Sequence, residues 1–379
     1  MNSSSRFRIL MADSIRIWGG AQRFIVELAE GLTTRGHHVT IQTLPGSPLA
    51  GHAGQRGLPV REVWTRADSA PWTVIPLVRA IHQAKYDVII TTFDKDLRTT
   101  GLAGRIVARL TRRPITIFHT RECDDPLKNK PRYRWFYTKV ADHIIVNSRA
   151  TLDTTLGSAP WLSRDRISIL YKGIDLSDYA NPDPGPWRRR LDPGGGSVVI
   201  GYAGQLIARK RIDVLLGLLA SPDLAGLDWR LAIAGKGPEE DALQDQARRL
   251  GVQNRVEFCG FVDGIPAWMS ALDLFVLPSF IEGFGYVLAE AGAAGVPSVA
   301  YEASSIPEVV IDGETALLAP EADDAAFARH IKTLITDKAL RERMGQAARH
   351  DVFDRHGLDT MVERMESILT DVSAGPHHR

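Results

Sequence analysis

The sequence predicts an α/β protein with two doubly wound parallel sheets in tandem, each covered by helices on both faces. Three observations lead to this fold class. Short apolar runs alternate with helical patterns along both halves of the chain. A stretch rich in Pro and Gly separates the halves at 181–196. The length of 379 residues suits two domains of about 100–200 residues each.

The spacing of apolar residues places the individual elements. In the first half we expect strands at 7–11, 38–43, 87–92, 114–119, 143–147 and 166–170, and helices at 21–34, 97–110 and 132–141. In the second half we expect strands at 198–203, 230–234, 255–258, 274–277 and 298–300, and helices at 212–219 and 239–250. We therefore predict an N-terminal domain over 1–180, a linker over 181–196, a C-terminal domain over 197–354, and a final helix with a tail over 355–379. Ligands of such sheets bind outside the carboxyl ends of the strands.

The composition excludes several classes of protein. With 44% hydrophobic and 24% charged residues, the chain is neither disordered, collagen-like nor a coiled coil. A transmembrane helix requires an apolar run of about 18 residues, and the sequence contains none. Its first residues do not resemble a signal peptide. Cys123 and Cys259 are too few for a disulfide framework. These features favour a reduced, cytoplasmic protein.

The net charge of +1 hides an uneven distribution. Residues 1–190 hold 29 Lys and Arg against 17 Asp and Glu, a net charge of +12. Residues 191–379 hold 17 against 28, a net charge of −11. A basic N-terminal half attracts anions such as phosphates, nucleic acid or anionic lipids.

The segment PSFIEGFGYVLAE over 278–290 is the most informative motif. It runs from a buried strand through a glycine-punctuated turn into a helix, which places the amides of Gly283 to Gly285 at a helix N-terminus, a site for anions. Glu282 and Glu290 would lie about 12 Å apart along a helix axis, too far for the pair of a retaining glycosidase, which needs about 5 Å. They suit the two ends of one extended polar ligand. A plain corner with two solvated glutamates is an equal alternative.

Three further loops follow strands. The loop from Gly204 to Arg211 carries the consecutive cations Arg209, Lys210 and Arg211. These cations suit binding of a diphosphate. A plain helix start at the surface is the less favoured alternative, because a helix N-terminus prefers acidic side chains. Gly19 and Gly20 allow a phosphate to approach the backbone, as does the loop Gly235-Lys236-Gly237-Pro238, although each is also an ordinary tight turn.

Two candidates carry weaker signals. His119 ends an expected strand at the edge where sites gather, but a lone histidine is more often structural. Asp94-Lys95-Asp96 has the spacing of a metal-binding pair, and we interpret it as a solvated loop.

A segment over 128–137 mixes cations with aromatic residues, and Arg105, Arg109, Arg112 and Arg113 add positive charge to the same half. This mixture favours an anionic membrane surface slightly over a basic helix face with core aromatics. Nucleic acid is not expected as a partner, because no binding module is present.

Taken in order, these motifs resemble the glycosyl transferases group 1 family, the retaining family 4 glycosyltransferases of GT-B fold. The resemblance covers nearly the whole chain and rests on Gly19-Gly20, His119, Tyr171-Lys172-Gly173-Ile174-Asp175, Gly204 to Arg211, Gly235-Lys236-Gly237-Pro238, Val256 to Gly260, Glu282-Gly283-Phe284-Gly285 and Glu290. It implies two Rossmann-like domains that face each other across a cleft, an acceptor site in the first, a nucleotide-sugar site mainly in the second, and a final helix that crosses back.

The resemblance also implies roles for residues. Glu290 would bind the ribose, Glu282 the donor sugar, Arg209 and Lys210 the diphosphate, and His119 the sugar near the transfer centre. The implied catalytic residues are His119, Glu282, Arg209 and Lys210, and the implied substrate-binding residues are Gly19, Gly20, Gly204, Gly283, Phe284, Gly285 and Glu290. The family often has Arg where this chain has Gln205, and Asn where this chain has Lys172. These two departures leave the identity of the donor undetermined.

The implied function is retaining transfer of a sugar from a UDP- or GDP-sugar to a glycan or lipid-linked acceptor, as in cell-surface polysaccharide, lipopolysaccharide or glycolipid biosynthesis. No cofactor and no metal ion are expected. The implied location is the cytoplasm, at the inner face of the membrane. Two alternatives stay open, a GT-B-fold nucleotide-sugar epimerase and a non-catalytic module that binds sugar nucleotides.

Overall fold

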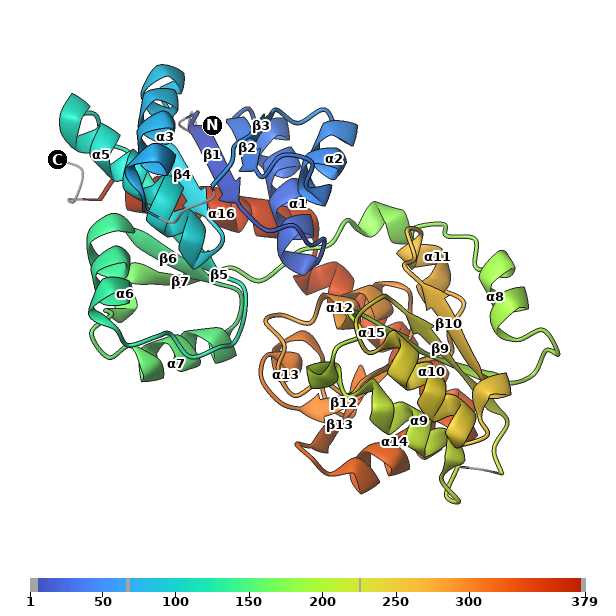
Figure 1. Cartoon of the computed structure of the whole chain (residues 1–379). Helices are drawn as coiled ribbons and strands as arrows, with labels where there is room; N and C mark the ends of the chain where they lie inside the picture. Colours follow the sequence, from blue (N-terminus) through green and yellow to red (C-terminus); the bar gives the residue numbers. More distant parts are fainter. Residues whose placement is uncertain (1–5, 66–68, 225, 376–379) are drawn as a thin grey trace. The chain divides into compact units, whose positions relative to one another are not determined.

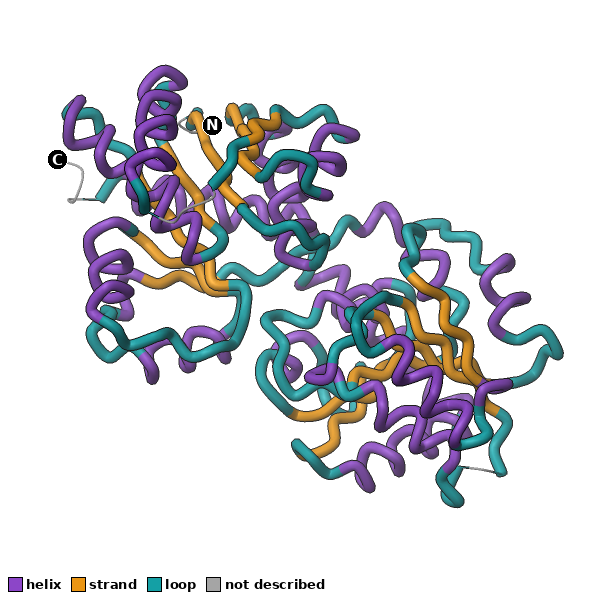
Figure 2. The backbone as a smooth tube through the Cα atoms, viewed as in Figure 1, coloured by secondary structure: helices purple, strands orange, loops and turns teal. Residues whose placement is uncertain are grey.

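The computed structural model describes residues 6–65, 69–224 and 226–375, which form two compact units. Unit 1 comprises Met1–Gly173 with Leu358–Arg379, and unit 2 comprises Ile174–Gly357. Each unit contains one parallel sheet with helices packed along it (Figures 1 and 2). The predicted fold class, two doubly wound α/β sheets, is confirmed.

The sheet of unit 1 has the strand order β3-β2-β1-β4-β5-β6-β7. Its strands are β1 (Arg8–Asp13), β2 (His38–Thr43), β3 (Val60–Glu62), β4 (Val88–Thr91), β5 (Thr116–Arg121), β6 (His143–Val146) and β7 (Ile167–Ile169). Its helices are α1 (Gly20–Thr34), α2 (Pro48–Gln55), α3 (Pro71–Ala84), α4 (Asp94–Asp96), α5 (Leu102–Thr111), α6 (Pro131–Trp135), α7 (Arg149–Ser158) and α16 (Leu358–Ser373). All residues of β4 and β6 are buried, as expected for central strands with helices on both faces.

Helix α16 packs on α1 within unit 1. Gly31 of α1 makes this approach possible, because a Cβ atom there would lie 2.4 Å from Cγ2 of Val362. At the end of α1, Arg35 pairs with Glu363 at 2.9 Å and with Glu366 at 3.0 Å. The last helix of the chain is therefore part of the unit that the first residues begin.

The sheet of unit 2 has the strand order β10-β9-β8-β11-β12-β13. Its strands are β8 (Val198–Ala203), β9 (Trp229–Ala234), β10 (Val256–Gly260), β11 (Leu274–Leu277), β12 (Ser298–Glu302) and β13 (Ala316–Pro320). Its helices are α8 (Gly185–Leu191), α9 (Ile212–Ala220), α10 (Glu240–Arg249), α11 (Ile265–Met269), α12 (Tyr286–Ala293), α13 (Ile306–Val309), α14 (Asp324–Thr336) and α15 (Lys338–Arg355). Trp229 and Trp268 are among the largest fully buried side chains of its core.

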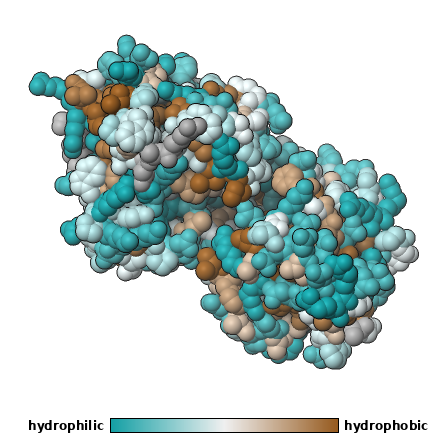
Figure 3. Space-filling model, in the orientation of Figure 1, coloured by the Kyte–Doolittle hydropathy of each residue, from teal (hydrophilic) through white to brown (hydrophobic). Residues whose placement is uncertain are grey.

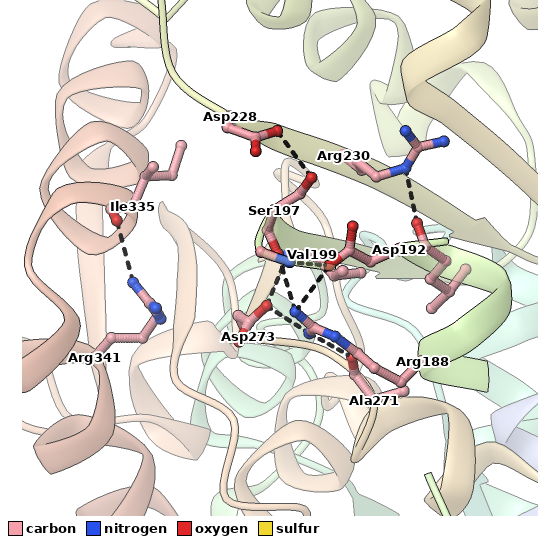
Figure 4. Close-up of polar contacts among 12 residues, drawn as sticks. Arg188, Asp192, Ser197, Val199, Asp228, Arg230, Ala271, Asp273, Ile335 and Arg341 are labelled. Carbon is pink, nitrogen blue, oxygen red and sulfur yellow. Dashed lines mark hydrogen bonds and ion pairs between the residues drawn. The ribbon is translucent and has the colours of Figure 1, made fainter. Parts of the chain in front are cut away.

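The stretch over 181–196 contains α8, and Arg188 fastens this helix to the start of the second sheet (Figure 4). The Arg188 guanidinium pairs with Asp273 at 2.6 Å and donates to the carbonyl oxygens of Ser197 at 2.9 Å and Ala271 at 3.1 Å. Asp273 also accepts from the amide of Val199 in β8 at 2.8 Å. These contacts place α8 in unit 2.

The surface is polar on the face shown in Figure 3, where apolar residues form separate patches on each unit. In the part of the chain that the structure describes, every helix is too short or too polar to cross a bilayer.

Candidate functional site

The strand order explains why distant motifs of unit 2 meet. β8 lies between β9 and β11. Strands β9 and β10 lie on one side of β8, and β11, β12 and β13 on its other side, so the strand order reverses between β8 and β11. The loops that leave the carboxyl ends of these two neighbours diverge and open a crevice, where ligands of doubly wound sheets bind. The loop after β8 contains Gly204 to Arg211, and the loop after β11 contains Glu282 to Gly285.

The glycines after β8 and β9 let two loops touch. A Cβ atom on Gly235 would lie 1.8 Å from the carbonyl oxygen of Gly204, and one on Gly237 would lie 2.2 Å from that of Leu206. The loops are joined by a hydrogen bond from the Leu206 amide to the carbonyl oxygen of Lys236 at 3.0 Å. Gly204 and Gly235 also have φ angles of 155° and 139°, which favour glycine. These glycines fix the shape of the loop that carries the cations.

Lys210 and Glu282, 72 residues apart in sequence, form an ion pair with side chains only 12% and 11% exposed. The backbone of Glu282 is held in place, since Ser304 and Ser305 donate to its carbonyl oxygen at 2.7 and 3.0 Å. The pair neutralises two charges that would be costly to bury separately. Burial, together with the negative charge of Glu282, raises the pKa of the neighbouring Tyr202 above its usual value.

Arg209 lies on the exposed side of the same loop. Among the described residues its side chain has no hydrogen-bond or ion-pair partner, in contrast to Lys210. It is therefore available to an incoming anion.

Arg211 anchors the cationic loop, a role that the sequence did not reveal. It has a left-handed backbone with φ of 53°, pairs with Asp324 at 3.1 Å, and stacks over the ring of Phe280 at 4.3 Å. Asp324 also accepts from the hydroxyl of Tyr301. The side chain of Arg211 thus has a structural role. Of the other two cations, Arg209 is exposed, and a ligand of Lys210 would have to compete with Glu282.

The turn into α12 has the predicted strand–turn–helix form. Gly285 precedes the helix with φ of 87°, a conformation that glycine adopts without strain. Phe284 is buried and packs against His356 with ring centroids 5.4 Å apart. Glu282 and Glu290 are both buried, so the alternative of a corner with two solvated glutamates is wrong.

In unit 1 the strand order reverses between β1 and β4, and the loop that leaves β1 leads to the glycine pair. Gly19 precedes α1 in an extended conformation and Gly20 is its first residue. Gln22 of the first turn donates to Asp13 at the end of β1 at 2.9 Å.

The segment 94–96 is not the solvated loop that we expected. Asp96 is buried and accepts from the amides of Ser14 and Phe93, each at 3.3 Å. Burial raises the pKa of Asp96 and of Asp13, and the proximity of the two carboxyl groups acts in the same direction on Asp96. This proximity could not be predicted from the sequence, because it depends on β1 and β4 being neighbours in the sheet.

His119 lies inside β5 rather than at its end, because pairing with β6 continues to Arg121. The ring is buried and both nitrogens have partners. Nδ1 lies 3.0 Å from Thr91 Oγ1, and Nε2 lies 3.0 Å from the hydroxyl of Tyr137. The Tyr137 hydroxyl donates to Asp94 at 2.7 Å. Burial alone would raise the pKa of Asp94, but interactions with His119, Tyr137 and Arg121 outweigh it and lower the pKa to about 2.

The segment 128–137 divides between surface and core. Trp135 is exposed at the end of α6, whereas Phe136 and Tyr137 are buried. Arg132 and Arg134 are exposed, and Arg132 donates to the hydroxyl of Ser69 at 3.4 Å. This contact brings α6 near the first turn of α3, where Trp72 is exposed.

Comparisons with known proteins agree with this architecture. The family model Glycosyltransferase Family 4 matches residues 18–178, and the model Glycosyl transferases group 1 matches residues 185–351. The chain is 34% identical to N-acetyl-alpha-D-glucosaminyl L-malate synthase of Bacillus anthracis over 206 residues, which are 54% of each chain. It is 26% identical to the lipopolysaccharide core biosynthesis glycosyltransferase LpsE of Rhizobium meliloti (strain 1021), covering 93% of this chain and 96% of that protein.

The crystal structure of Anabaena Alr3699/HepE in complex with UDP and glucose has a similar fold. The TM-score is 0.81 at 23% sequence identity, and the match covers 97% of this chain and 100% of that chain. Together the two family models span most of the chain, in the order that the two units require. The chain therefore belongs to the glycosyl transferases group 1, the family 4 glycosyltransferases, and has their GT-B fold.

Proposed function

We propose that the protein is a retaining glycosyltransferase that moves a sugar from a UDP- or GDP-sugar to a glycan or lipid-linked acceptor. The observation that carries the proposal is the buried pair of Lys210 and Glu282 beside the exposed Arg209 and the glycine turn into α12. A carboxylate that faces the sugar and two cations that face the diphosphate are what such a donor requires.

The donor is bound by unit 2 and the acceptor by unit 1. Glu290 binds the ribose hydroxyls, Glu282 binds the sugar with the amides of Gly283 to Gly285, and Arg209 and Lys210 bind the diphosphate. Gly19 and Gly20, at the start of α1 in unit 1, belong to the proposed substrate-binding residues. The UDP-glucose complex of Anabaena Alr3699/HepE supports a donor of this class.

The transfer breaks the bond between the anomeric carbon and the diphosphate oxygen, whose electron pair leaves with the diphosphate. Positive charge then develops on the sugar and negative charge on the leaving group. Arg209 and Lys210 stabilise that negative charge, and the Lys210 side chain is largely shielded from solvent, which strengthens the interaction. The acceptor hydroxyl attacks the same face, and a leaving phosphate oxygen takes its proton. Because two side-chain cations serve the diphosphate, the proposal requires no metal ion, and turnover should persist with a chelator.

The network of His119, Tyr137 and Asp94 holds the proposed catalytic histidine within unit 1. Asp94 keeps its negative charge over the physiological pH range, since its pKa is lowered to about 2. Through Tyr137 this carboxylate fixes the orientation of the His119 ring.

The acceptor half works at an anionic membrane surface, at the inner face of the membrane. Support comes from the aromatic–cationic patch, which we define as Trp72, Trp135, Lys128, Lys130, Arg132 and Arg134. The likeness to LpsE supports an acceptor in lipopolysaccharide or a related surface glycan. Aromatic rings with flanking cations are typical of proteins that rest on the headgroup region.

Two experiments test the proposal. A thermal-shift screen with UDP, GDP and their sugar conjugates should raise the melting temperature with one nucleotide series, because a ligand of the folded state stabilises it. Glu290→Ala should abolish that shift, whereas Glu314→Ala, an exposed glutamate of unit 2, should preserve it. Equal shifts in both variants would contradict the ribose role of Glu290.

Two assays identify the alternative functions. Conversion of the donor in the absence of an acceptor would identify an epimerase. Binding without turnover on a broad acceptor panel would identify a non-catalytic module.

The membrane part has its own test. Neutralising Lys128, Lys130, Arg132 and Arg134 to Gln should reduce sedimentation with anionic vesicles and leave donor binding intact. The control carries the same charge change on unit 2, at Arg249, Lys332, Lys338 and Arg343. If both quadruple variants sediment like the parent protein, the membrane role of this patch is wrong.

A further inference from the structure

A strongly basic cavity of about 610 Å³ lies in unit 1. Its lining includes no residue of the proposed substrate sites or of the aromatic–cationic patch. Its walls come from the end of α5, from the turn before β6, and from the residues that directly precede β5, β6 and β7. It therefore opens at the amino edge of the sheet, whereas Asp13, His119 and the glycine pair belong to the carboxyl half. The lining contains six cations and one acid: Arg105, Arg109, Arg112, Arg113, Lys139, Arg166 and Asp142.

Three of these cations are held rigidly by the fold. Arg105 pairs with Asp142 at 2.6 Å and donates to the carbonyl oxygen of Val140 at 2.7 Å. Arg113 pairs with Asp87 at 2.6 Å. Arg166 donates to the carbonyl oxygen of Asp142 at 3.2 Å. These guanidinium groups form a fixed wall of positive charge.

The other three cations, Arg109, Arg112 and Lys139, are exposed. Within the described ranges, none of their side chains has a hydrogen-bond or ion-pair partner. Arg112 ends α5 in a left-handed conformation with φ of 55°, a position where Gly or Asn is more common. An arginine there adds charge at the mouth of the cavity although the backbone conformation disfavours it.

The acids nearby do not neutralise the cavity. Asp142 and Asp87 are engaged by Arg105 and Arg113, and Asp165 beside Arg166 is exposed and bonds to Ser163. Six cations against the lining carboxylate of Asp142 and the Asp87 carboxylate that pairs with Arg113 leave a formal charge of +4. The buried His143 next to the cavity is consistent with this field, since burial and then the charge of Arg166 lower its pKa to about 4.

We propose that this cavity, lined by Arg105, Arg109, Arg112, Arg113, Lys139 and Arg166, binds an anion with at least two phosphoryl groups. One phosphoryl group carries a charge of about −2, which leaves about half of the cavity's charge uncompensated, whereas two phosphoryl groups match it. Guanidinium forks match phosphate oxygens in a bidentate manner, and five of the six cations are arginines. The phosphoryl groups belong either to a soluble effector or to the headgroups of anionic lipids.

Two binding arms distinguish these sources. Titration calorimetry with tripolyphosphate measures binding of a soluble polyanion, and sedimentation with phosphatidylcholine vesicles, with and without phosphatidylglycerol, measures binding to headgroups. The test variant is Arg109→Gln/Arg112→Gln/Lys139→Gln, and the control is Arg249→Gln/Arg343→Gln/Lys332→Gln, with the same charge change at exposed positions of unit 2. Because the donor loops and the aromatic–cationic patch also attract anions, the informative quantity is the difference between the two variants.

We expect the test variant to bind one of these probes at least about tenfold more weakly than the control, since each lost charge-assisted hydrogen bond is worth about that factor. A loss in the calorimetric arm assigns a soluble effector, and a loss confined to the vesicle arm assigns lipid headgroups. Equal affinities of the two variants for both probes would overturn the proposal. Because the three replaced side chains are exposed, a matching melting temperature verifies that the test variant is folded.

Discussion

Glu282→Gln should separate the two roles that we give to the buried ion pair. In the structure the Lys210 ammonium is held by Glu282, so a diphosphate has to compete with that carboxylate for it. The neutral amide removes the competition and keeps nearly the same shape. We therefore expect UDP or GDP, whichever the protein prefers, to bind Glu282→Gln at least as tightly as the parent protein, while sugar transfer falls strongly.

Lys210→Met should behave in the opposite way. It keeps the apolar stem but loses one charge-assisted hydrogen bond, worth about 1.5–3 kcal/mol. This corresponds to a nucleoside diphosphate affinity about 10- to 150-fold weaker. Titration calorimetry measures both affinities, and a transfer assay measures turnover. Glu257→Gln is a suitable control, since Glu257 pairs with Arg190 in a more exposed part of the same unit.

Equal weakening of diphosphate binding by Glu282→Gln and Lys210→Met would contradict the assignment of Glu282 to the sugar. That result would mean that Glu282 supports the diphosphate site and not the sugar site. Stability has to be checked alongside, because breaking a buried pair destabilises by about 3–5 kcal/mol when one charge is left alone. The glutamine still accepts a hydrogen bond from Lys210, so we expect a loss at the low end of that range in urea unfolding.

Three further substitutions test the fold around the sites. Gly237→Ala should lower both the nucleotide affinity and the melting temperature, because the new Cβ atom would lie 2.2 Å from the carbonyl oxygen of Leu206. Gly251→Ala is the control for the loss of a glycine, since no atom lies within 4 Å of a Cβ at that position; the melting temperature is the readout. His356→Phe should reduce the fall in the free energy of unfolding, measured in urea, between about pH 7 and pH 4. Burial lowers the pKa of His356 to about 4. The neutral ring therefore adds to stability above about pH 6.5, and this contribution is lost as the pH falls towards 4. An unchanged pH slope would contradict that assignment. Gly31→Val should displace α16 by collision with Val362 and raise proteolysis of the C-terminal helix, and a helix as protected as in the parent would show that the contact is not needed.

Much of the fold could be predicted from apolar spacing alone. The expected strands at 38–43, 198–203 and 274–277 have the boundaries of β2, β8 and β11. The short edge strands β3 and β13 were missed, because β3 has three residues with a charged pair and β13 ends on Pro320. β3 has no fully buried residue and therefore leaves no clear apolar pattern in the sequence.

The candidate site was only partly predictable. The glycine turn and Glu282 could be found because a strand–turn–helix motif is local in sequence. The pairing of Lys210 with Glu282 and that of Arg211 with Asp324 join residues 72 and 113 positions apart, and they depend on which strands are neighbours. Strand order is set by packing over the whole sheet, so these contacts required the structure.

Helix α16 packs on α1 within unit 1, although the whole of unit 2 separates them in the sequence, and this has a consequence for protein synthesis. Residues 174–357 are continuous and hold everything that unit 2 needs, so this unit can fold as soon as it leaves the ribosome. Unit 1 has to wait for its last helix, whose buried Met361, Val362, Met365, Ile368 and Leu369 complete it. A nascent chain that stops before Leu358 would hold a finished second unit and a first unit with an uncovered apolar face, a species prone to aggregation and to degradation.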